Sequence, residues 1–227
     1  IARRDFGPIG AFMGYDFHVT PDGPKLIEVN TNAGGAFLNA ILARAQRACC
    51  AEGEATFETD SAATFGAKVA QMFIDEWRRQ RHTGKPGLIA IVDDTPERQH
   101  LYAEFQLAKA LLEEHGLETV IADAGQLEPD GRQLSIRGRR IGLVYNRLVD
   151  FSLDEPGHAA LRTAYLEDGV VVTPNPHVHA LFADNRNLAL LSYVNRLDRW
   201  GPPPTRIRAL ATGLPTIGWT ISRTYRH

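Results

Sequence analysis

The sequence contains very little cysteine: its only two cysteines among 227 residues, Cys49 and Cys50, are neighbours. Adjacent cysteines do not form an ordinary unstrained disulfide with each other, so a fold held together by disulfides is not expected. We interpret both as core or boundary thiols. Such sparse use of cysteine is typical of a cytoplasmic protein.

Long hydrophobic runs and an excess of basic charge are also missing. No stretch approaches the roughly 18 apolar residues that a membrane helix needs. The 25 lysines and arginines against 27 aspartates and glutamates give a net charge of −2, which does not favour nucleic acid or anionic lipid as a main partner. With 44% hydrophobic and 23% charged residues, the chain has the composition of a globular domain. We expect a cytoplasmic α/β protein without a nucleic-acid or membrane partner.

Both ends of the sequence look cut. The chain begins Ile-Ala-Arg-Arg, without an initiator methionine and without the plan of a signal peptide. The closing residues 220–227 have neither helical nor strand periodicity. We therefore expect a piece of a longer protein, in which a missing segment could carry part of an active site.

The first third of the sequence predicts a hairpin and two helices. Residues 12–30 have strand composition on both sides of a turn cluster at 20–24. The spacing of apolar residues then predicts a helix from about residue 37 towards Cys50 and a second over 61–81. The break at 82–87 is the expected internal boundary.

The remainder predicts a β-α-β unit and several shorter elements. A continuous apolar strand at 88–92, a helix that starts near Pro96 and a strand at 118–122 form this unit, most simply parallel and right-handed. Later we expect a hairpin of strands 133–136 and 141–146, a helix near 158–167, a strand at 170–172, a helix at about 184–197 and a stiff linker at 201–204.

Three oxygen-bearing residues flank the predicted hairpin turn. Asp16 lies on the outgoing strand, while Glu28 and Asn30 are two apart on the returning strand and therefore share a face. If the strands pair in antiparallel register, two carboxylates and an amide oxygen can converge, and such hard ligands suit Mg²⁺. Gly34 and Gly35 in the next loop leave room for a ligand. The alternative is a surface hairpin whose polar residues bind nothing.

Other polar residues have two open interpretations each. Asp93 and Asp94 end an apolar strand, where open α/β sheets usually bind ligands. Asp94, Glu97 or Gln99 could therefore contact a substrate, or they could simply cap the following helix.

Two histidines stand in a His-x-His pattern, His177 and His179. No third residue keeps the spacing of a zinc site. A polar loop is favoured over a metal site.

The hairpin segment resembles the metal-binding hairpin of the ATP-grasp ligases. That family's pattern is an Asp, a turn, then Glu-x-Asn-Thr and a small-residue loop, and residues 14–17 and 26–35 follow it. In D-alanine ligase-like members, the three corresponding residues hold two Mg²⁺ ions against the phosphates of ATP. The resemblance thus implies that Asp16, Glu28 and Asn30 bind Mg²⁺, with two ions expected, and that ATP is the co-substrate.

The order of the segments resembles the circularly permuted branch of this family, typified by eukaryotic-type glutathione synthetase and related to glutathionylspermidine synthetase-like proteins. The hairpin comes first here, whereas it is near the C-terminal end of most ATP-grasp proteins. The resemblance implies three parts. Residues 1–84 would be an ATP-grasp portion with hairpin and helices, 85–156 a Rossmann-like substrate-binding domain, and 157–227 the truncated start of the nucleotide-binding portion.

The resemblance also implies roles for individual residues. Arg147 stands where the family's "VVY-x-R" strand presents an arginine, so we expect it to act in catalysis by binding a substrate carboxylate. An ion pair with Asp150 is the alternative. The implied substrate-binding residues are Asn32, Gly34, Gly35, Asp94, Glu97, Gln99, Asn146 and Arg147, and the implied ATP-binding residues are Asn185 and Arg186.

The sequence departs from the glutathione synthetase pattern at three places. Gly14 stands where that enzyme has an arginine, Asn32 and its neighbours replace serines, and Arg186 stands near the place of a phosphate-contacting lysine. The first two departures point away from γ-glutamylcysteine as the substrate.

The expected activity is that of an ATP- and Mg²⁺-dependent carboxylate–amine ligase that works through an acyl phosphate. Its partners would be a small carboxylate and an amine or short peptide, and a homodimer is consistent with the family. Two alternatives stay open. The chain could be a truncated or degenerate relative that binds a peptide-like ligand without catalysis, or an interaction module whose hairpin binds nothing.

Overall fold

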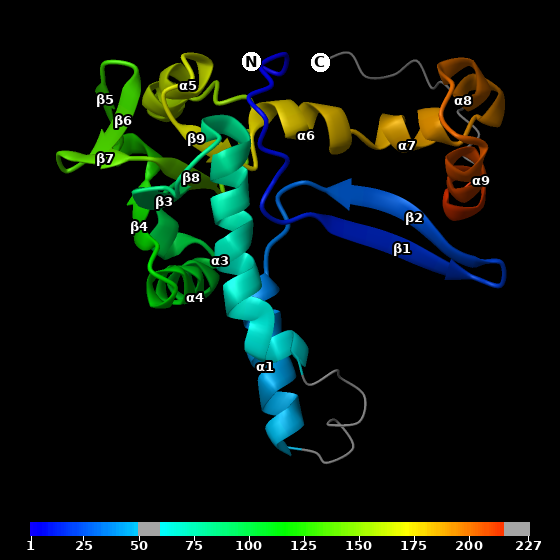
Figure 1. Ribbon diagram of the computed structural model, residues 1–227, viewed down its shortest axis with the longest axis horizontal. Helices are drawn as coiled ribbons and strands as arrows, with labels where there is room; N and C mark the ends of the chain where they lie inside the picture. The colour runs from blue at the N-terminus through cyan, green and yellow to red at the C-terminus, as the bar shows by residue number, and fades with distance from the viewer. Residues whose placement is uncertain (50–59, 216–227) are drawn as a thin grey trace. The chain divides into compact units, whose positions relative to one another are not determined.

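The computed structural model describes residues 1–49 and 60–215 (Figure 1). Cys50 and the closing segment 220–227 therefore lie outside the described residues. The chain forms two compact units. The first comprises residues 1–12 and 32–179, and the second comprises residues 13–31 and the chain from residue 180 onward.

A four-stranded sheet lies at the centre of the first unit, and all its neighbouring strands are parallel. The strand β3 is buried along its whole length, as its continuous apolar sequence predicts. In spatial order the strands are β4 (Glu118–Asp123), β3 (Leu88–Asp93), β8 (Leu143–Asn146) and β9 (Val171–Thr173).

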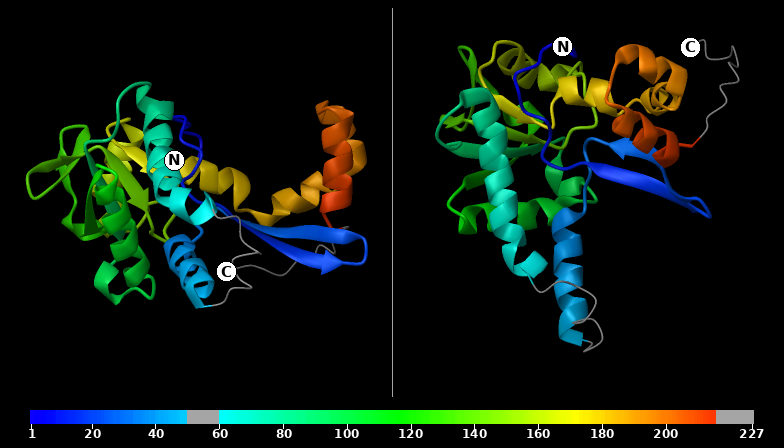
Figure 2. Two further views of the ribbon diagram at one scale, coloured as in Figure 1. Left: turned by 60° about the horizontal axis from the view of Figure 1, so that its bottom comes forward. Right: turned by 45° about the vertical axis from the view of Figure 1, so that its right-hand side comes forward.

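Three helices cover one face of this sheet: α1 (Ala36–Cys49), α3 (Asp60–Arg81) and α4 (Tyr102–Glu114). Their apolar stripes meet Ile89 and Ile91 of β3 in one buried cluster. The ring of Phe73 is fully buried and lies edge-on to Tyr145 at 5.1 Å between centroids. All views show α1 and α3 side by side (Figures 1 and 2). The predicted helix over 61–81 is confirmed.

The opposite face of the sheet packs against α5 (Ala159–Leu166) and a small antiparallel sheet. This sheet contains β5 (Glu128–Asp130), β6 (Gln133–Ile136) and β7 (Arg139–Ile141). In the described part of this unit there are also three short 3₁₀ turns: η1 (Pro96–Arg98), η2 (Ala124–Gln126) and η3 (Pro156–His158).

The predicted hairpin between residues 133 and 146 was partly wrong. Its return strand is two strands, because β7 pairs with β6 whereas β8 joins the parallel sheet beside β3. Gly142 lies between them, where its amide donates to the Leu88 carbonyl at 2.9 Å. A Cβ on Gly142 would lie 3.1 Å from the ring of Trp77, so glycine permits this close passage.

The second unit contains the hairpin β1 (Gly14–Thr20) and β2 (Gly23–Asn30). Its helices α7 (Asn185–Leu191) and α9 (Pro204–Gly213) contact β2, and α8 (Val194–Trp200) lies between them in the chain. The single helix predicted over 184–197 is therefore two helices, because Tyr193 has an extended backbone. The helix α6 (Pro176–Phe182) spans the limit between the units.

The two units divide the chain differently from the limits expected at residues 84 and 156. Residues on both sides of residue 84 share one core, since α1 and α3 bury their apolar faces against β3 and β8. The hairpin belongs instead with the last helices. Among the described residues, no helix is long and apolar enough to cross a membrane.

Candidate functional site

The hairpin brings its three candidate metal ligands to one face. Asp16 pairs directly with Glu28, and Asn30 pairs with Gly14 two positions along the same ladder. Residues directly opposite or two apart in antiparallel strands point to the same side. The register shifts by one residue just after Asp16, where the pairing skips Ile27. The side chains of the three candidate ligands are exposed.

The donor set on this face fits a hard divalent cation. Two carboxylates and an amide oxygen are ligands that Mg²⁺ accepts, and Mg²⁺ usually keeps several waters or binds phosphate oxygens as well. Within residues 1–49 and 60–215, no three His, Cys, Asp or Glu side chains gather closely enough to hold a metal ion. An ion on Asp16 and Glu28 would therefore also need Asn30 and oxygens of a bound ligand.

In the first unit, Arg147 follows β8 and holds the loop that comes after the hairpin. Its guanidinium donates to the side-chain oxygen of Asn32, to the Ala33 carbonyl at 3.1 Å and to the Asn32 carbonyl at 3.3 Å. It also lies 5.4 Å from the centroid of the Tyr145 ring. The side chain is nearly buried, with 7% of the residue exposed. The alternative partner, Asp150, accepts instead from the Glu155 amide.

The two glycines of this loop differ in their surroundings. A Cβ on Gly34 would lie 2.6 Å from the Leu101 side chain and 3.2 Å from the Arg147 guanidinium. The space beside Gly34 is thus occupied by protein. Gly35 has a φ of +85°, a conformation that side-chain-bearing residues rarely adopt. Glycine is therefore needed at position 34 because there is no space for a side chain, and at position 35 because of the backbone conformation.

The polar residues at the carboxyl ends of β3 and β8 make mainly local hydrogen bonds. Gln99 donates to the Asp94 carbonyl at 2.6 Å, and Asn146 accepts from the Leu148 amide at 3.1 Å while buried. Glu97 is exposed in the first turn of η1. Of the predicted substrate-binding residues, Glu97 and Asp94 present exposed carboxylates at the carboxyl end of β3.

The sequence did not reveal a histidine between two carboxylates at this end of the sheet. His158 Nε2 lies 2.9 Å from Asp94 Oδ1, and its Nδ1 lies 2.8 Å from Asp150 Oδ2. Burial opposes a charge on His158, but the hydrogen bonds to the two carboxylates outweigh it and raise the pKa of the ring above its ordinary value. The one sequence signal at His158 was the helix expected to start near residue 158.

A second feature at the same edge is the carboxyl group of Asp93, the last residue of β3. Burial raises the pKa of Asp93 to about 6, although the Asp94 amide and the charge of Arg147 act in the opposite direction. A carboxyl group that titrates near neutral pH beside an arginine is a candidate for proton transfer or substrate contact.

Glu104 of α4 is a buried carboxylate that sequence reasoning missed. Its two oxygens accept from the amides of Phe37, at 3.1 Å, and Leu38, at 2.9 Å. These amides belong to the first turn of α1, whose unpaired donors and dipole favour a negative charge. Glu104 thus fixes the helix that follows the glycine loop.

The candidate ATP residues lie at the start of α7 in the second unit. Asp184 caps this helix by accepting from the Arg186 amide at 2.9 Å. The guanidinium of Arg186 is exposed, and its Nε lies 2.8 Å from Asp184 Oδ2. Asn185 is the first residue of the helix.

The two histidines expected in a polar loop lie on α6 instead. His177 Nδ1 is 2.6 Å from the Ala2 carbonyl, and the ring of His179 stacks on Phe151 at 3.5 Å between centroids. Burial lowers the pKa of His179. Because the two histidines contact different partners, we assign both to packing and not to a shared metal site.

A comparison with solved structures finds a similar fold in a glutathione synthetase-like effector from Globodera pallida, solved in its apo form. The TM-score is 0.64 at 17% sequence identity, and the match covers 89% of this chain and 49% of that one. This chain therefore spans about half the length of that structure. Neither a protein-family model nor a curated protein matches the sequence. The chain has a glutathione synthetase-like fold.

Proposed function

We propose that this chain is part of an ATP- and Mg²⁺-dependent carboxylate–amine ligase of the circularly permuted ATP-grasp type. In such a reaction, a carboxylate attacks the γ-phosphate of ATP to give an acyl phosphate and ADP. An amine then attacks the acyl carbon, an amide bond forms, and inorganic phosphate leaves. The protein's task in phosphoryl transfer is mainly to position the reactants and to stabilise charge.

The observation that carries this proposal is the register of the hairpin. Asp16 faces Glu28, and Asn30 lies on the same side, so two carboxylates and an amide oxygen could share a phosphate-bound Mg²⁺. The glutathione synthetase-like fold adds support, since that neighbour's name refers to a ligase. Mg²⁺ bound there would neutralise charge on the phosphates of ATP.

The roles of the other residues follow from where their polar atoms lie. Asn32 and Ala33 are held by Arg147, so the loop after the hairpin is fixed before any substrate arrives. Arg147 would bind a substrate carboxylate by exchanging part of this contact, because a guanidinium has five donors. Asp94 and Glu97 carry exposed carboxylates and would receive the amine. Asn185 and Arg186 would contact ATP.

A binding role without catalysis is the second candidate. It is favoured by the exposed Arg186, whose guanidinium already pairs with Asp184. An arginine neutralised in this way contributes less to a phosphate contact. In that case the hairpin and loop would hold a peptide-like ligand and no ADP would form.

The metal assignment is tested with Mn²⁺ as a paramagnetic probe of this chain. We expect selective broadening of the amide signals around Asp16, Glu28 and Asn30, with loss of this broadening in Glu28→Gln. The matched control is Asp22→Asn, which removes an exposed carboxylate from the turn of the same hairpin. Broadening that spreads over all exposed carboxylates, or that survives Glu28→Gln, would contradict the assignment.

Catalysis is tested by ADP release from ATP with Mg²⁺ and mixtures of small carboxylates and amines, in the longest protein that contains this chain. A ligase sustains ADP release over many turnovers only when both an acid and an amine are present, because the amine is needed to consume the acyl phosphate. Glu28→Gln should abolish this release and leave the circular dichroism spectrum unchanged. Localised Mn²⁺ binding without ADP release would favour the second candidate.

A further inference from the structure

A pocket of about 650 Å³ lies at the amino ends of the parallel strands, away from the carboxyl ends where Asp93 and Arg147 lie. Its floor is formed by Gly87 and Leu88 at the start of β3 and by Gly142 just before β8. This volume is within the usual range of about 300 to 1,000 Å³ for small-molecule sites. The pocket belongs wholly to the first unit.

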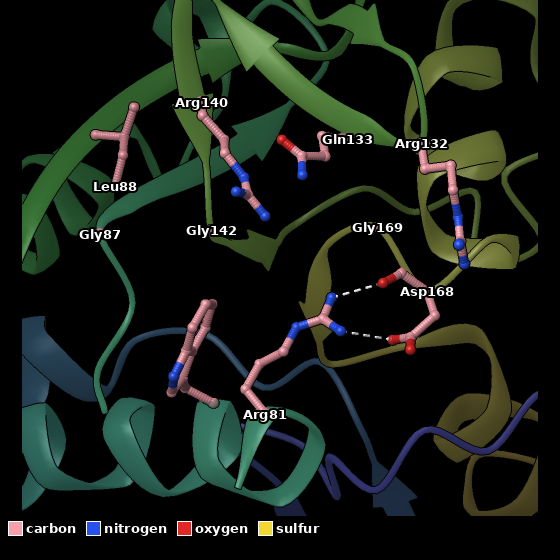
Figure 3. A pocket seen from close by; sticks show the side chains of 10 residues that line it. Arg81, Gly87, Leu88, Arg132, Gln133, Arg140, Gly142, Asp168 and Gly169 are labelled. Carbon is pink, nitrogen blue, oxygen red and sulfur yellow. Dashed lines mark hydrogen bonds and ion pairs between the residues drawn. The ribbon is translucent and has the colours of Figure 1, made fainter. Parts of the chain in front are cut away.

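Three arginines from three segments line this space, which we call the arginine pocket. They are Arg81 at the end of α3, Arg132 before β6 and Arg140 in β7. In Figure 3 the guanidinium of Arg140 points into the pocket above Arg81, and Arg132 lies along the opposite wall. Among the described residues that line the pocket, Asp168 is the only acidic one.

The contacts of Asp168 show which arginine it neutralises. Its Oδ1 accepts from Arg81 at 2.9 Å and from Gln80 at 2.6 Å, and its carbonyl accepts from Arg81 at 2.7 Å. The Asp168 carboxylate therefore neutralises the charge of Arg81. Two positive side chains, Arg132 and Arg140, are left without a carboxylate partner among the described residues.

The two remaining arginines differ in how they are held. Arg132 donates to the Glu167 carbonyl at 2.6 Å, and a Cβ on Gly169 would lie only 1.5 Å from the Arg132 carbonyl oxygen. The backbone around Arg132 is thus fixed against the loop before β9. The guanidinium of Arg140 has no hydrogen-bond or ion-pair partner in the described part of the chain, so all of its donors are available.

The lining also offers apolar surface for an organic ligand. Trp77 and Leu88 contribute to it, and Trp77 is oriented by a hydrogen bond from its indole nitrogen to the Thr83 carbonyl at 2.9 Å. An indole ring beside guanidinium groups that have no carboxylate partner suits a molecule with an anionic group and a planar or apolar body.

We propose that the arginine pocket binds a small molecule through a compact polyanionic group, either a phosphoryl group or a di- or tricarboxylate. Both classes present several oxygens with charge above one, which Arg132 and Arg140 can meet with paired N–H donors. A chain with a net charge of −2 does not attract anions in general, so the attraction comes from this local excess of positive charge. The site is separate from the proposed ligase chemistry.

The test is isothermal titration calorimetry of the chain with inorganic pyrophosphate and, separately, with citrate. The chain is freed of metal ions on a chelating resin beforehand and no divalent cation is added, so that a Mg²⁺-dependent phosphate site on the hairpin does not contribute to the binding heat. We expect saturable binding of at least one of the two anions at one site per chain. The tighter of the two identifies the class of the natural ligand.

Arg140→Gln should weaken this binding by at least about tenfold, because it removes an unpaired charge-assisted donor. The matched control is Arg139→Gln on the same strand, since Arg139 is outside the lining and pairs with Glu118. It should change the affinity by less than about twofold. Arg140 is exposed, so its substitution leaves the fold intact.

Three results would overturn the proposal: no binding of either anion, equal weakening by the Arg139 and Arg140 variants, or loss of binding in Asp16→Asn. The last result would place the anion on the hairpin. The Mn²⁺ experiment reports on the ligase proposal alone, so either proposal can fail without the other.

Discussion

Arg147 donates to both the side-chain oxygen and the backbone carbonyl of Asn32, across 115 positions of sequence. A buried guanidinium requires such acceptors, because removing a charged donor from water without them is costly. Asn32 is the first residue of the first unit after the hairpin. The contact therefore fixes the place where the chain re-enters that unit.

Replacing Asn32 with leucine should destabilise the fold by about 2 kcal/mol, because part of the buried Arg147 guanidinium loses its acceptor. Asn32→Asp keeps the acceptor and adds a charge opposite Arg147, so it should retain at least the wild-type stability at neutral pH. The free energy of unfolding in urea measures both. Equal destabilisation by the two substitutions would show that the contact contributes little.

The stability of the His158 cluster should depend on pH. The pKa of His158 is raised in the folded state, so the protonated ring stabilises the fold fully below its ordinary pKa of 6.5, and this contribution is lost as the pH rises through the folded pKa. His158→Gln should therefore lower the urea midpoint most at about pH 6 and progressively less at higher pH. The exposed His100, changed to Gln, is the control for the substitution itself.

Asp150 adds the opposite dependence at acidic pH. Burial opposes its charge, but the hydrogen bonds from the Glu155 amide and His158 lower the pKa of Asp150 below the ordinary 3.8. Its contribution is present above pH 3.8 and is lost as the pH falls through the lowered value. Asp150→Asn should thus destabilise the protein at neutral pH and make less difference in strong acid.

Asp93 should give a third pH dependence of stability, opposite in direction to that of Asp150. Its pKa is raised to about 6 from the ordinary 3.8, so the folded state holds the proton more tightly than the unfolded chain does. Ionisation of Asp93 therefore costs stability as the pH rises from about 4 to about 6. Relative to the wild type, Asp93→Asn should become more stable over this interval and then level off. A constant difference in melting temperature across the interval would contradict the raised pKa.

The capping of α1 by Glu104 can be tested with substitutions on α4, the helix that carries Glu104. Glu104→Ala leaves the amides of Phe37 and Leu38 without their acceptor and should cost about 2 kcal/mol of unfolding free energy. Glu104→Gln keeps one acceptor oxygen and should recover part of this loss. The control is Glu113→Ala on the same helix, where the carboxylate is exposed and pairs with Lys109, with an expected effect below about 0.5 kcal/mol.

The sequence predicted those helices and strands in which apolar residues recur at a regular spacing or form a continuous run. The helix α3, the buried strand β3 and its parallel neighbour β4 lie where the pattern placed them, within a residue at each end. The hairpin was predicted as well, since turn residues separate two strand-like runs. Its metal ligands and their role remain predictions, because register aligns side chains without showing what they bind.

Other features depend on partners far away in the chain, which periodicity does not reveal. A histidine at a helix start gives no sign that two carboxylates, 8 and 64 positions away, will enclose it. Likewise, only Gly142 separates β7 from β8 in the sequence, and they form two strands because each pairs with a different neighbouring strand. The arginine pocket gathers Arg81, Arg132 and Arg140 in the same way.

The order of the two units along the chain makes residues 13–31 an insertion within the first unit. The flanking residues are both anchored on the end of one strand: Phe12 packs on Tyr145 at 6.2 Å between ring centroids, and Asn32 is bound by Arg147. Insertions whose ends are fixed on a common base can be exchanged with little effect on the host. The hairpin could therefore be exchanged, in evolution or by design, for a different hairpin or loop while the parallel sheet stays unchanged.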